Sequence, residues 1–419
     1  MKKFFAIFAV VFAASWVGLG AVEESVFGTA PSMNRREADA VKEAQEAKTP
    51  AEAEAALLEA SKKSWAGSAV FFNLANLQYN AGKIDDAVKS YKTAIEKTPK
   101  FFMAQRNLGF ALSSAGREDE AFGELVKALA LSGGSDSEIL AWLTAYHIRR
   151  KDYSSALAAC NQSILYAPQK RDCRRAKAMI LYELGDYAES ERLCCELLSE
   201  NAADRDILAV LAKSRISLKD WAGAMSALEI MRALKLADAR VLELYGDVLC
   251  KNGLYADAAK IYAESKSDSG VSRAAWALAN SGEYQKALAA CSKSSAADVA
   301  KVRAAALAGL GRYAEAAAQL RAYVDSFPDD SSAVLMLGRA LADMADWQAA
   351  KICFERAEAD PELGLSALYG RLRVCVALNE KAEALDAARK ISQISPRAEL
   401  AAYIKYLEGQ PDAVEKFSR

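Results

Sequence analysis

The sequence predicts an all-α fold, built as one elongated array of about ten helical hairpins. The chain has 419 residues, whereas a single hydrophobic core stops growing at about 250–300 residues. Apolar residues make up 52% of the chain, with only 8 prolines and 22 glycines, a composition that excludes a disordered chain. Turn residues recur at an interval of about 34 residues in most of the chain, which is typical of a repeat array.

The turn residues define the register of this array. They are Gly82, Gly116, Lys151, Gly185, Lys219, Gly253, Gly282, Gly311, Ala345 and Asn379. Five residues after each comes a small residue: Ala87, Ala121, Ala156, Ser190, Ala224, Ala258, Ala287, Ala316, Ala350 or Ala384. Glycine suits the end of a first helix because it adopts positive φ without a Cβ penalty. The small residue lets a second helix approach the first closely, so each unit is predicted to be a hairpin.

Residues 1–21 are expected to be a signal peptide or a membrane anchor. Lys2 and Lys3 precede an apolar run from Phe4 to Val22, the charged and hydrophobic regions of an export signal. The run is also long enough to cross a bilayer as a helix, which takes about 20 residues. Both alternatives place the rest of the chain outside the cytoplasmic membrane. We therefore expect an exported protein, either periplasmic or attached to the outer face of that membrane.

Residues 66–396 are expected to hold the hairpins. Leucines on the first helices and aromatic residues on the second helices fill the space between them: Leu74, Leu108, Leu143 and Leu211, with Tyr91, Tyr262 and Phe354. Prolines close several units, where a helix must stop: Pro99, Pro168, Pro328 and Pro396. The intervals from Gly253 to Gly282 and from Gly282 to Gly311 are shorter than the others. They predict shortened helices or loops around residues 265–298, with a change in curvature there.

Both ends of a repeat array need a cap. Residues 22–65 are expected to be a linker followed by a degenerate N-terminal capping repeat. Thr49, Pro50 and Glu52 have the order of an N-cap, a first helical position and an acidic first turn. Residues 397–419 are expected to be a C-terminal capping helix, since Tyr403, Ile404 and Leu407 follow the last closing proline.

The repeating positions resemble those of the tetratricopeptide repeat family, whose period is about 34 residues. The unit most similar to the family pattern contains Phe71, Leu74, Ala75, Gly82, Ala87, Tyr91, Ala94 and Pro99. The next unit has Leu108, Gly109, Gly116, Ala121, Leu125 and Ala128 at the same positions. The resemblance implies a right-handed superhelical solenoid of about ten repeats with a concave groove lined by the first helices.

The resemblance also implies which residues face this groove. They are Phe72, Asn73, Asn76, Tyr79, Asn80, Arg106, Asn107, Phe110 and Trp142. An amide both donates to and accepts from a peptide backbone, so asparagines at matching positions, such as Asn73 and Asn107, suit an extended chain. They are similar to the asparagine ladder of some family members and, with Arg106, to part of the carboxylate clamp, although the clamp's lysines are missing. The alternative is that these residues are ordinary polar residues on a solvated face.

The sequence gives no support for an enzyme. It contains none of the motifs G-x-x-x-x-G-K-[ST], H-E-x-x-H and G-x-S-x-G. His147 is the only histidine of the chain and falls at a core position of a first helix. A net charge of −1 does not favour nucleic acid, whose binding domains are strongly basic. We therefore predict no catalytic residue, cofactor, metal or small-molecule substrate; the expected partner is a protein or peptide.

The eight cysteines have two interpretations. They are Cys160, Cys173, Cys194, Cys195, Cys250, Cys291, Cys353 and Cys375. Three of them share one core position of the second helices, where cysteine behaves as a small buried hydrophobe. A disulfide between Cys173 and either Cys160 or Cys194 is the alternative, because adjacent helices could bring their Cα atoms within about 4.4–6.8 Å.

Two functions fit these observations. The first is a non-enzymatic interaction scaffold of the cell envelope that binds a protein or extended peptide in its concave groove. The second is a structural component of an envelope machine for polysaccharide secretion or outer-membrane protein assembly, as the resemblance to exported members of the family implies. In the second case contacts would spread along the convex face and the ends.

Overall fold

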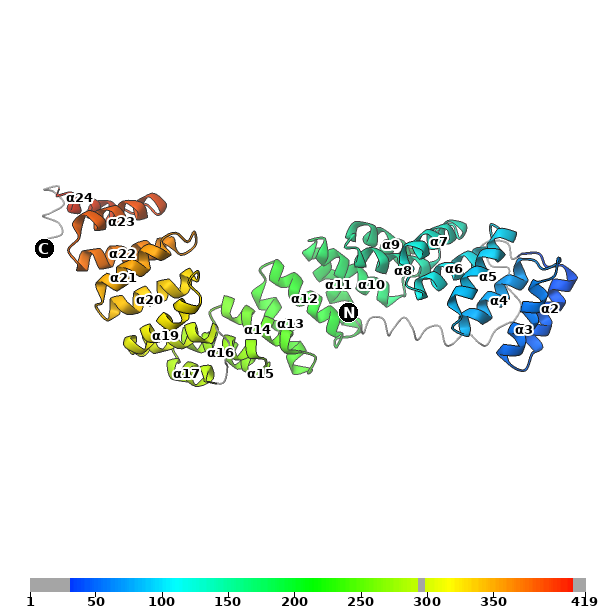
Figure 1. The fold of residues 1–419 in the computed structure, drawn as a ribbon, viewed down its shortest axis with the longest axis horizontal. Helices are drawn as coiled ribbons and strands as arrows, with labels where there is room; N and C mark the ends of the chain where they lie inside the picture. Colours follow the sequence, from blue (N-terminus) through cyan, green and yellow to red (C-terminus); the bar gives the residue numbers. More distant parts are fainter. Residues whose placement is uncertain (1–30, 293–297, 410–419) are drawn as a thin grey trace. The chain divides into compact units, whose positions relative to one another are not determined.

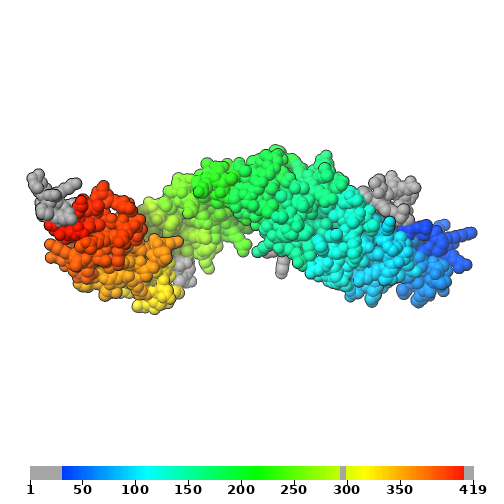
Figure 2. Space-filling view, turned by 90° about the horizontal axis from the view of Figure 1, so that it is seen from above, coloured from blue at the N-terminus to red at the C-terminus, as the bar shows by residue number. Residues whose placement is uncertain are grey.

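The computed structural model describes residues 31–292 and 298–409. Over these ranges it contains 23 helices and no strand, so the predicted all-α fold class is confirmed. The chain divides into two compact units, Met1–Glu200 and Asn201–Arg419. In each unit, helical hairpins stack side by side in the order of the sequence (Figure 1 and Figure 2).

The hairpins pair consecutive helices. The first unit contains α2 (Arg35–Glu46), α3 (Pro50–Ser61), α4 (Ser68–Asn80), α5 (Ile84–Lys97), α6 (Phe102–Ser114), α7 (Glu118–Leu131), α8 (Ser137–Arg149), α9 (Tyr153–Tyr166), α10 (Arg171–Glu183) and α11 (Tyr187–Glu200). The second unit contains α12 (Arg205–Ser217), α13 (Trp221–Ala233), α14 (Ala239–Lys251), α15 (Tyr255–Glu264), α16 (Asp268–Asn280), α17 (Tyr284–Cys291), α18 (Asp298–Gly309), α19 (Tyr313–Ser326), α20 (Ser331–Asp343), α21 (Trp347–Ala357), α22 (Gly364–Ala377), α23 (Lys381–Ile394) and α24 (Ala398–Leu407). The even-numbered helices from α4 to α22 are the first helices of the ten hairpins predicted from the turn register.

Every turn residue of that register has a left-handed backbone conformation, with φ between 57° and 86°. Four of them are not glycine, namely Lys151, Lys219, Ala345 and Asn379. In the first such turn the N–H of Lys83 donates to the carbonyl of Gln78 at 2.8 Å, which satisfies a carbonyl at the end of α4. The turn residues therefore mark the ends of the first helices. Glycine is preferred at these positions because of the backbone conformation, and not because a side chain would find no space.

Side-chain caps and prolines fix the other helix ends. Several first helices follow an N-cap whose side chain accepts a hydrogen bond from their first turn: Asp136, Asp204, Asp238, Ser267 and Asp330. The second helices α5, α9, α19 and α23 each end two residues before one of the closing prolines. This agrees with the steric exclusion of the α conformation for the residue that precedes proline.

The two shorter intervals of the register arise from short second helices. Helix α15 has 10 residues and α17 has 8, whereas α5, α7, α9 and α11 have 14 each. The predicted shortening is thus confirmed. The predicted change in curvature stays a prediction.

At the N-terminal side, α2 and α3 form a hairpin with a small core that includes Val41, Leu57 and Leu74. The predicted cap of α3 is confirmed, because Thr49 Oγ1 accepts from the N–H of Glu52 at 3.2 Å and Pro50 is the first helical residue. At the other side, α24 follows the last hairpin. The expected signal peptide or anchor lies outside the described residues. Among those that are described, no helix has the length and apolar character needed to cross a membrane.

The turn conformation predicts opposite effects for one substitution at two positions. A Cβ added at Gly82 or at Gly123, inside α7, would meet no atom within 4 Å, but Gly82 has φ +78°. Gly82→Ala should therefore lower the free energy of unfolding by about 1 kcal/mol. Gly123→Ala should raise it by about 1 kcal/mol, because alanine is the better helix former.

Urea denaturation followed by circular dichroism measures both effects. Ala345→Gly is the third variant. It should stabilise the chain, because Ala345 has a φ of 60°, a conformation that is strained for alanine and not for glycine. Equal effects at Gly82 and Gly123 would contradict the assignment of the register to the turn conformation.

Candidate functional site

The first helices of the first unit present a common row of side chains. Positions three, six and nine residues before each turn residue lie on one side of a helix, because about 3.6 residues make one turn. On α4, α6 and α8 these positions are Asn73, Asn76, Tyr79, Asn107, Phe110, Ser113, Trp142, Ala145 and Ile148. Side chains of this row hydrogen-bond from helix to helix, as described below. We refer to these nine residues as the first-helix face.

An amide network lies in the middle of the first-helix face. Asn107 Nδ2 donates to Asn76 Oδ1 at 3.1 Å, which joins α6 to α4. The hydroxyl of Tyr91 on α5 donates to the same oxygen at 2.5 Å. Tyr91 is only 2% exposed, and burial raises the pKa of its phenol, so the hydroxyl stays protonated and acts as the donor. Two donors thus hold the Asn76 carboxamide in one orientation.

The expected pairing of asparagines differs from the one in the structure. Asn73 and Asn107 hold matching positions in consecutive hairpins, but Asn107 bonds to Asn76 instead. Asn73 Nδ2 donates back to the carbonyl of Ala69 on its own helix at 2.8 Å. Asn107 therefore bonds to the residue three positions after its counterpart on α4, and not to the counterpart itself. Asn80, also expected to face the groove, is exposed.

Hydroxyl groups extend the network along the face. The hydroxyls of Tyr79 on α4 and Ser114 on α6 lie 2.8 Å apart. The indole Nε1 of Trp142 on α8 donates to Ser113 Oγ at 2.9 Å. Trp142 is 7% exposed and stacks on Tyr146, so it supports the face and offers little surface to a ligand. Tyr79 is half-buried and leaves part of its ring accessible.

Arg106 is engaged in ion pairs. Its guanidinium bonds to Asp136 at 3.0 Å and also to Glu138, and the side chain is 15% exposed. It also lies over the ring of Phe110 at 5.1 Å. A carboxylate ligand at this point would compete with two resident carboxylates, which disfavours the clamp-like role considered from the sequence.

Apolar surface borders the amide network. Phe72 is half-buried, and its ring lies 4.8 Å from Phe101 and 6.1 Å from Tyr91 between ring centroids. Phe110, on the neighbouring helix, is also half-buried. The face therefore combines oriented amides with partly covered aromatic rings.

Other clusters of polar residues have internal partners. His147 Nδ1 lies 3.3 Å from Asp152 Oδ2, and the half-buried imidazole packs edge-on against Phe122. Cys375, Glu380 and Glu383 have the spacing of three metal ligands. However, Lys351 Nζ lies 2.7 Å from Glu380 and 2.5 Å from Glu383, so an ammonium group already pairs with both carboxylates.

The cysteine pair proposed for a disulfide is close in space. Cys160 Sγ donates to the backbone carbonyl of Cys173 at 3.1 Å, and Cys173 Sγ lies 3.2 Å from Ser163 Oγ. Both thiols are free in the structure, and burial raises the pKa of Cys160 to about 12. Cys194, the other candidate partner, is buried. A disulfide of Cys173 with Cys160 or Cys194 stays a prediction.

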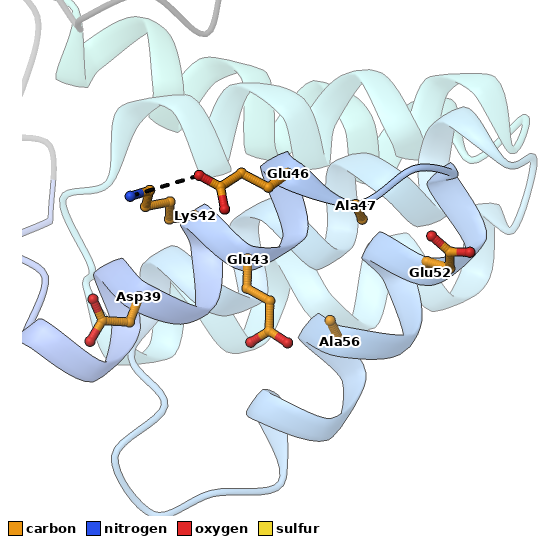
Figure 3. A pocket seen from close by; sticks show the side chains of 7 residues that line it. All are labelled: Asp39, Lys42, Glu43, Glu46, Ala47, Glu52 and Ala56. Carbon is orange, nitrogen blue, oxygen red and sulfur yellow. Dashed lines mark ion pairs between the residues drawn. The ribbon is translucent and has the colours of Figure 1, made fainter.

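A hollow of about 430 Å³ lies between α2 and α3 (Figure 3). Its rim carries Asp39, Glu43, Glu46 and Glu52, with Lys42 3.7 Å from Glu46. All five side chains are exposed to solvent. This hairpin therefore presents a solvated, charged surface; the expected capping role of residues 22–65 stays a prediction.

Sequence reasoning placed Tyr91 in the core and did not consider Ser113 or Ser114. The signal for Tyr91 was its hydroxyl: a buried tyrosine needs a hydrogen-bond partner that phenylalanine does not. Its partner, Asn76, lies on the preceding helix of the same hairpin. The serines carried no signal, because single hydroxyl groups on a helix surface are common.

The network predicts the effect of removing the Tyr91 hydroxyl. Phe354 occupies the same position in a later hairpin, so Tyr91→Phe fits the site sterically. The free energy of unfolding should fall by about 1 kcal/mol, the value of one buried hydrogen bond. A double-mutant cycle with Asn76→Ala in urea measures the coupling of the two residues; additive effects would show that the bond contributes nothing.

Comparison with known proteins agrees with the repeat architecture. The sequence model of the tetratricopeptide repeat family matches residues 72–136, 301–344 and 335–399. No curated protein sequence matches the chain.

Among solved structures, the chain is similar to a tetratricopeptide repeat protein from Parabacteroides merdae, with 20% identity over 56% of this chain and 93% of that one and a TM-score of 0.39. It is similar to YrrB, described as a tetratricopeptide repeat protein with an unusual peptide-binding site, with 16% identity over 42% and 89% of the two chains and a TM-score of 0.39. It is also similar to Naa15/Naa10 bound to HypK-THB, with 17% identity over 91% and 67% and a TM-score of 0.46. The family model covers these three stretches of the chain, and the ten hairpins on one register continue the same pattern between them, which supports the tetratricopeptide repeat family.

Proposed function

We propose that the protein is a non-catalytic scaffold that binds an extended peptide segment of a partner protein on the first-helix face of its first unit. The observation that supports this proposal most is the Asn76–Asn107 pair. These amides come from neighbouring helices and are held in one orientation by a buried tyrosine hydroxyl. A fixed carboxamide recognises a peptide unit with a smaller entropic cost than a freely rotating one.

The dimensions of the face favour an extended ligand. Consecutive first helices lie about 8–10 Å apart, which corresponds to about three residues of an extended chain. One peptide segment would therefore meet the amide pair and the Tyr79 ring in succession. The half-buried rings of Phe72 and Phe110 would provide apolar contact for alternate side chains of the same segment.

The amide pair gives a direct test of this function. Replacing Asn76 and Asn107 together by alanine should weaken partner binding about 10- to 100-fold, because two hydrogen bonds contribute about 1–3 kcal/mol. The partner is first identified by a photo-crosslinking residue at Tyr79 in living cells, and its affinity is then measured by calorimetry. Val126, which is 42% exposed on the second helix α7, is the matched crosslinking position outside the face.

Asn73→Ala is the comparison variant within the same face, because the Asn73 amide is bonded to its own helix and not to the Asn76–Asn107 pair. It should lose less than threefold in affinity. A double variant with unchanged affinity, or equal crosslinking from Tyr79 and Val126, would overturn the assignment of this face. Contacts found mainly from Val126 would instead support the structural component of an assembly machine.

We also propose that the protein works outside the cytoplasmic membrane, on the basis of the lysine-led apolar run that ends at Val22. A fusion of residues 1–30 to alkaline phosphatase, which is active only after export, should be active in a bacterial host. Replacing Phe5, Ile7 and Val10 by aspartate should abolish that activity, because the apolar region is lost. The mass of the mature chain distinguishes cleavage near residue 21 from a retained anchor. Equal activity of both fusions would contradict export.

A further inference from the structure

The second unit contains the same kind of network in charged form. The hydroxyl of Tyr262 on α15 donates to Asp247 Oδ1 on α14 at 2.6 Å. Arg273 Nη1 on α16 binds both oxygens of Asp247, at 2.8 and 2.7 Å. Asp247 and Tyr262 hold the positions in their hairpin that Asn76 and Tyr91 hold in theirs. An aspartate and an arginine thus stand where the first unit has two asparagines.

A large aromatic side chain follows on the same face. Trp276 lies on α16, six residues before the turn residue Gly282, the position that Asn76 has in its own hairpin. It is 45% exposed, whereas Trp142 on the face of the first unit is 7% exposed. Its ring meets Tyr255 edge-on at 5.8 Å, which fixes the indole and leaves one side uncovered. A fixed, half-exposed tryptophan is typical of a binding hot spot.

Small residues flank Trp276 on the next first helix. Val302 and Ala305 of α18 hold the positions nine and six residues before the turn residue Gly311. Val302 is 9% exposed and Ala305 is half-buried. Their short side chains leave room beside the indole for an apolar side chain of a ligand.

The charges on this face are not balanced. Glu243 accepts hydrogen bonds from the hydroxyls of Ser267 and Ser269, and these bonds, with the charges of Arg273 and Arg240, lower the pKa of its carboxyl group. Lys251 on α14 and Arg339 on α20 are exposed and form no ion pair with any residue that the structure describes. The face therefore has a surplus of positive charge.

The surroundings of Arg339 explain why its charge stays available. It holds the position of Asn76 and Asp247 in its own hairpin, but the residue that corresponds to Tyr91 is Phe354, which has no hydroxyl. The neighbouring arginine at the same position, Arg373, pairs with Asp343 at 3.0 Å. Within the described part of the chain, Arg339 is thus a free cation on one side of Trp276, and Lys251 is a free cation on the other.

From these observations we propose a second binding site, on α14, α16, α18 and α20, for an extended acidic peptide. An apolar side chain of the peptide packs on Trp276, and its carboxylates pair with Lys251 and Arg339. Helices α16 and α20 are two first-helix spacings apart, about 20 Å, which about six extended residues span. A basic peptide would also find the indole attractive, but it would be repelled by the surplus positive charge.

The test uses the full chain and a library of random dodecapeptides displayed on phage. Peptides captured by the wild type and not by Trp276→Ala should be rich in Asp and Glu and contain one aromatic or large aliphatic residue. One such peptide is then synthesised with a fluorescent label. Its dissociation constant, measured by fluorescence anisotropy, should rise at least tenfold for Trp276→Ala and for Arg339→Glu. It should rise less than threefold for Trp276→Phe. For the wild type, the dissociation constant should increase with salt concentration.

The Asn76→Ala, Asn107→Ala double variant is the matched control and should bind this peptide as the wild type does. The proposals for the two sites can therefore be contradicted independently of each other. The proposal would be overturned if the wild type and Trp276→Ala captured identical sets of peptides. It would also be overturned if the peptides captured by the wild type alone had a net positive charge. Trp276→Phe and Arg339→Glu, which change a half-exposed and an exposed side chain, keep the test valid if Trp276→Ala fails to fold.

Discussion

Each hairpin depends on the close approach of its two helices at one pair of positions, one on each helix. A Cβ added to Gly109 would lie 2.5 Å from Leu125 Cγ, and one added to Gly246 would lie 2.3 Å from the Tyr262 ring. Real Cβ contacts are longer than 3.0 Å, so these helices lie closer than alanine would permit. The close approach covers the apolar sides of both helices and brings the next hairpin into stacking distance.

The last hairpin of the register reverses the sizes. Its second helix has Ala388 at this position, and the first helix has Leu372. The residue before Leu372, Arg371, is 8% exposed, and its guanidinium bonds to Asp386 Oδ2 at 2.6 Å and lies 3.3 Å from Glu358. In this hairpin the larger residue of the pair therefore belongs to the first helix, and the buried Arg371 side chain joins that helix to the second.

The same contact places functional groups on the first-helix faces. A large second-helix residue lies deep between the helices, so the hydroxyl of a tyrosine there reaches the far side of the first helix. This occurs at Tyr91 and at Tyr262, each with a polar partner on the preceding helix. Packing and recognition are therefore linked. The small residue on the first helix lets the second helix approach closely, and this approach determines the position of the tyrosine hydroxyl on the first-helix side.

Most of the fold could be predicted from the sequence, because helix ends and helix contacts are local. The turn register, the closing prolines and the short helices α15 and α17 all follow from spacing along the chain. The site was predicted only in part. Position along a helix indicated that Asn76 and Asn107 share a face, but their mutual bond depends on how successive helices cross. The ion pairs of Arg106 depend in the same way on the adjacent helix α8.

The two faces differ in how they respond to their surroundings. The network of the first unit consists of neutral groups, whose hydrogen bonds are little affected by salt. The network of the second unit joins Asp247 to Arg273, and Lys251 and Arg339 add exposed positive charge. Salt screens exposed charges over about 8 Å at physiological ionic strength, so only the second face should lose affinity as salt is raised. At raised salt concentration, a partner bound to both faces would therefore keep its contact with the first unit and release the second. The salt dependence of binding thus indicates which unit a bound segment contacts.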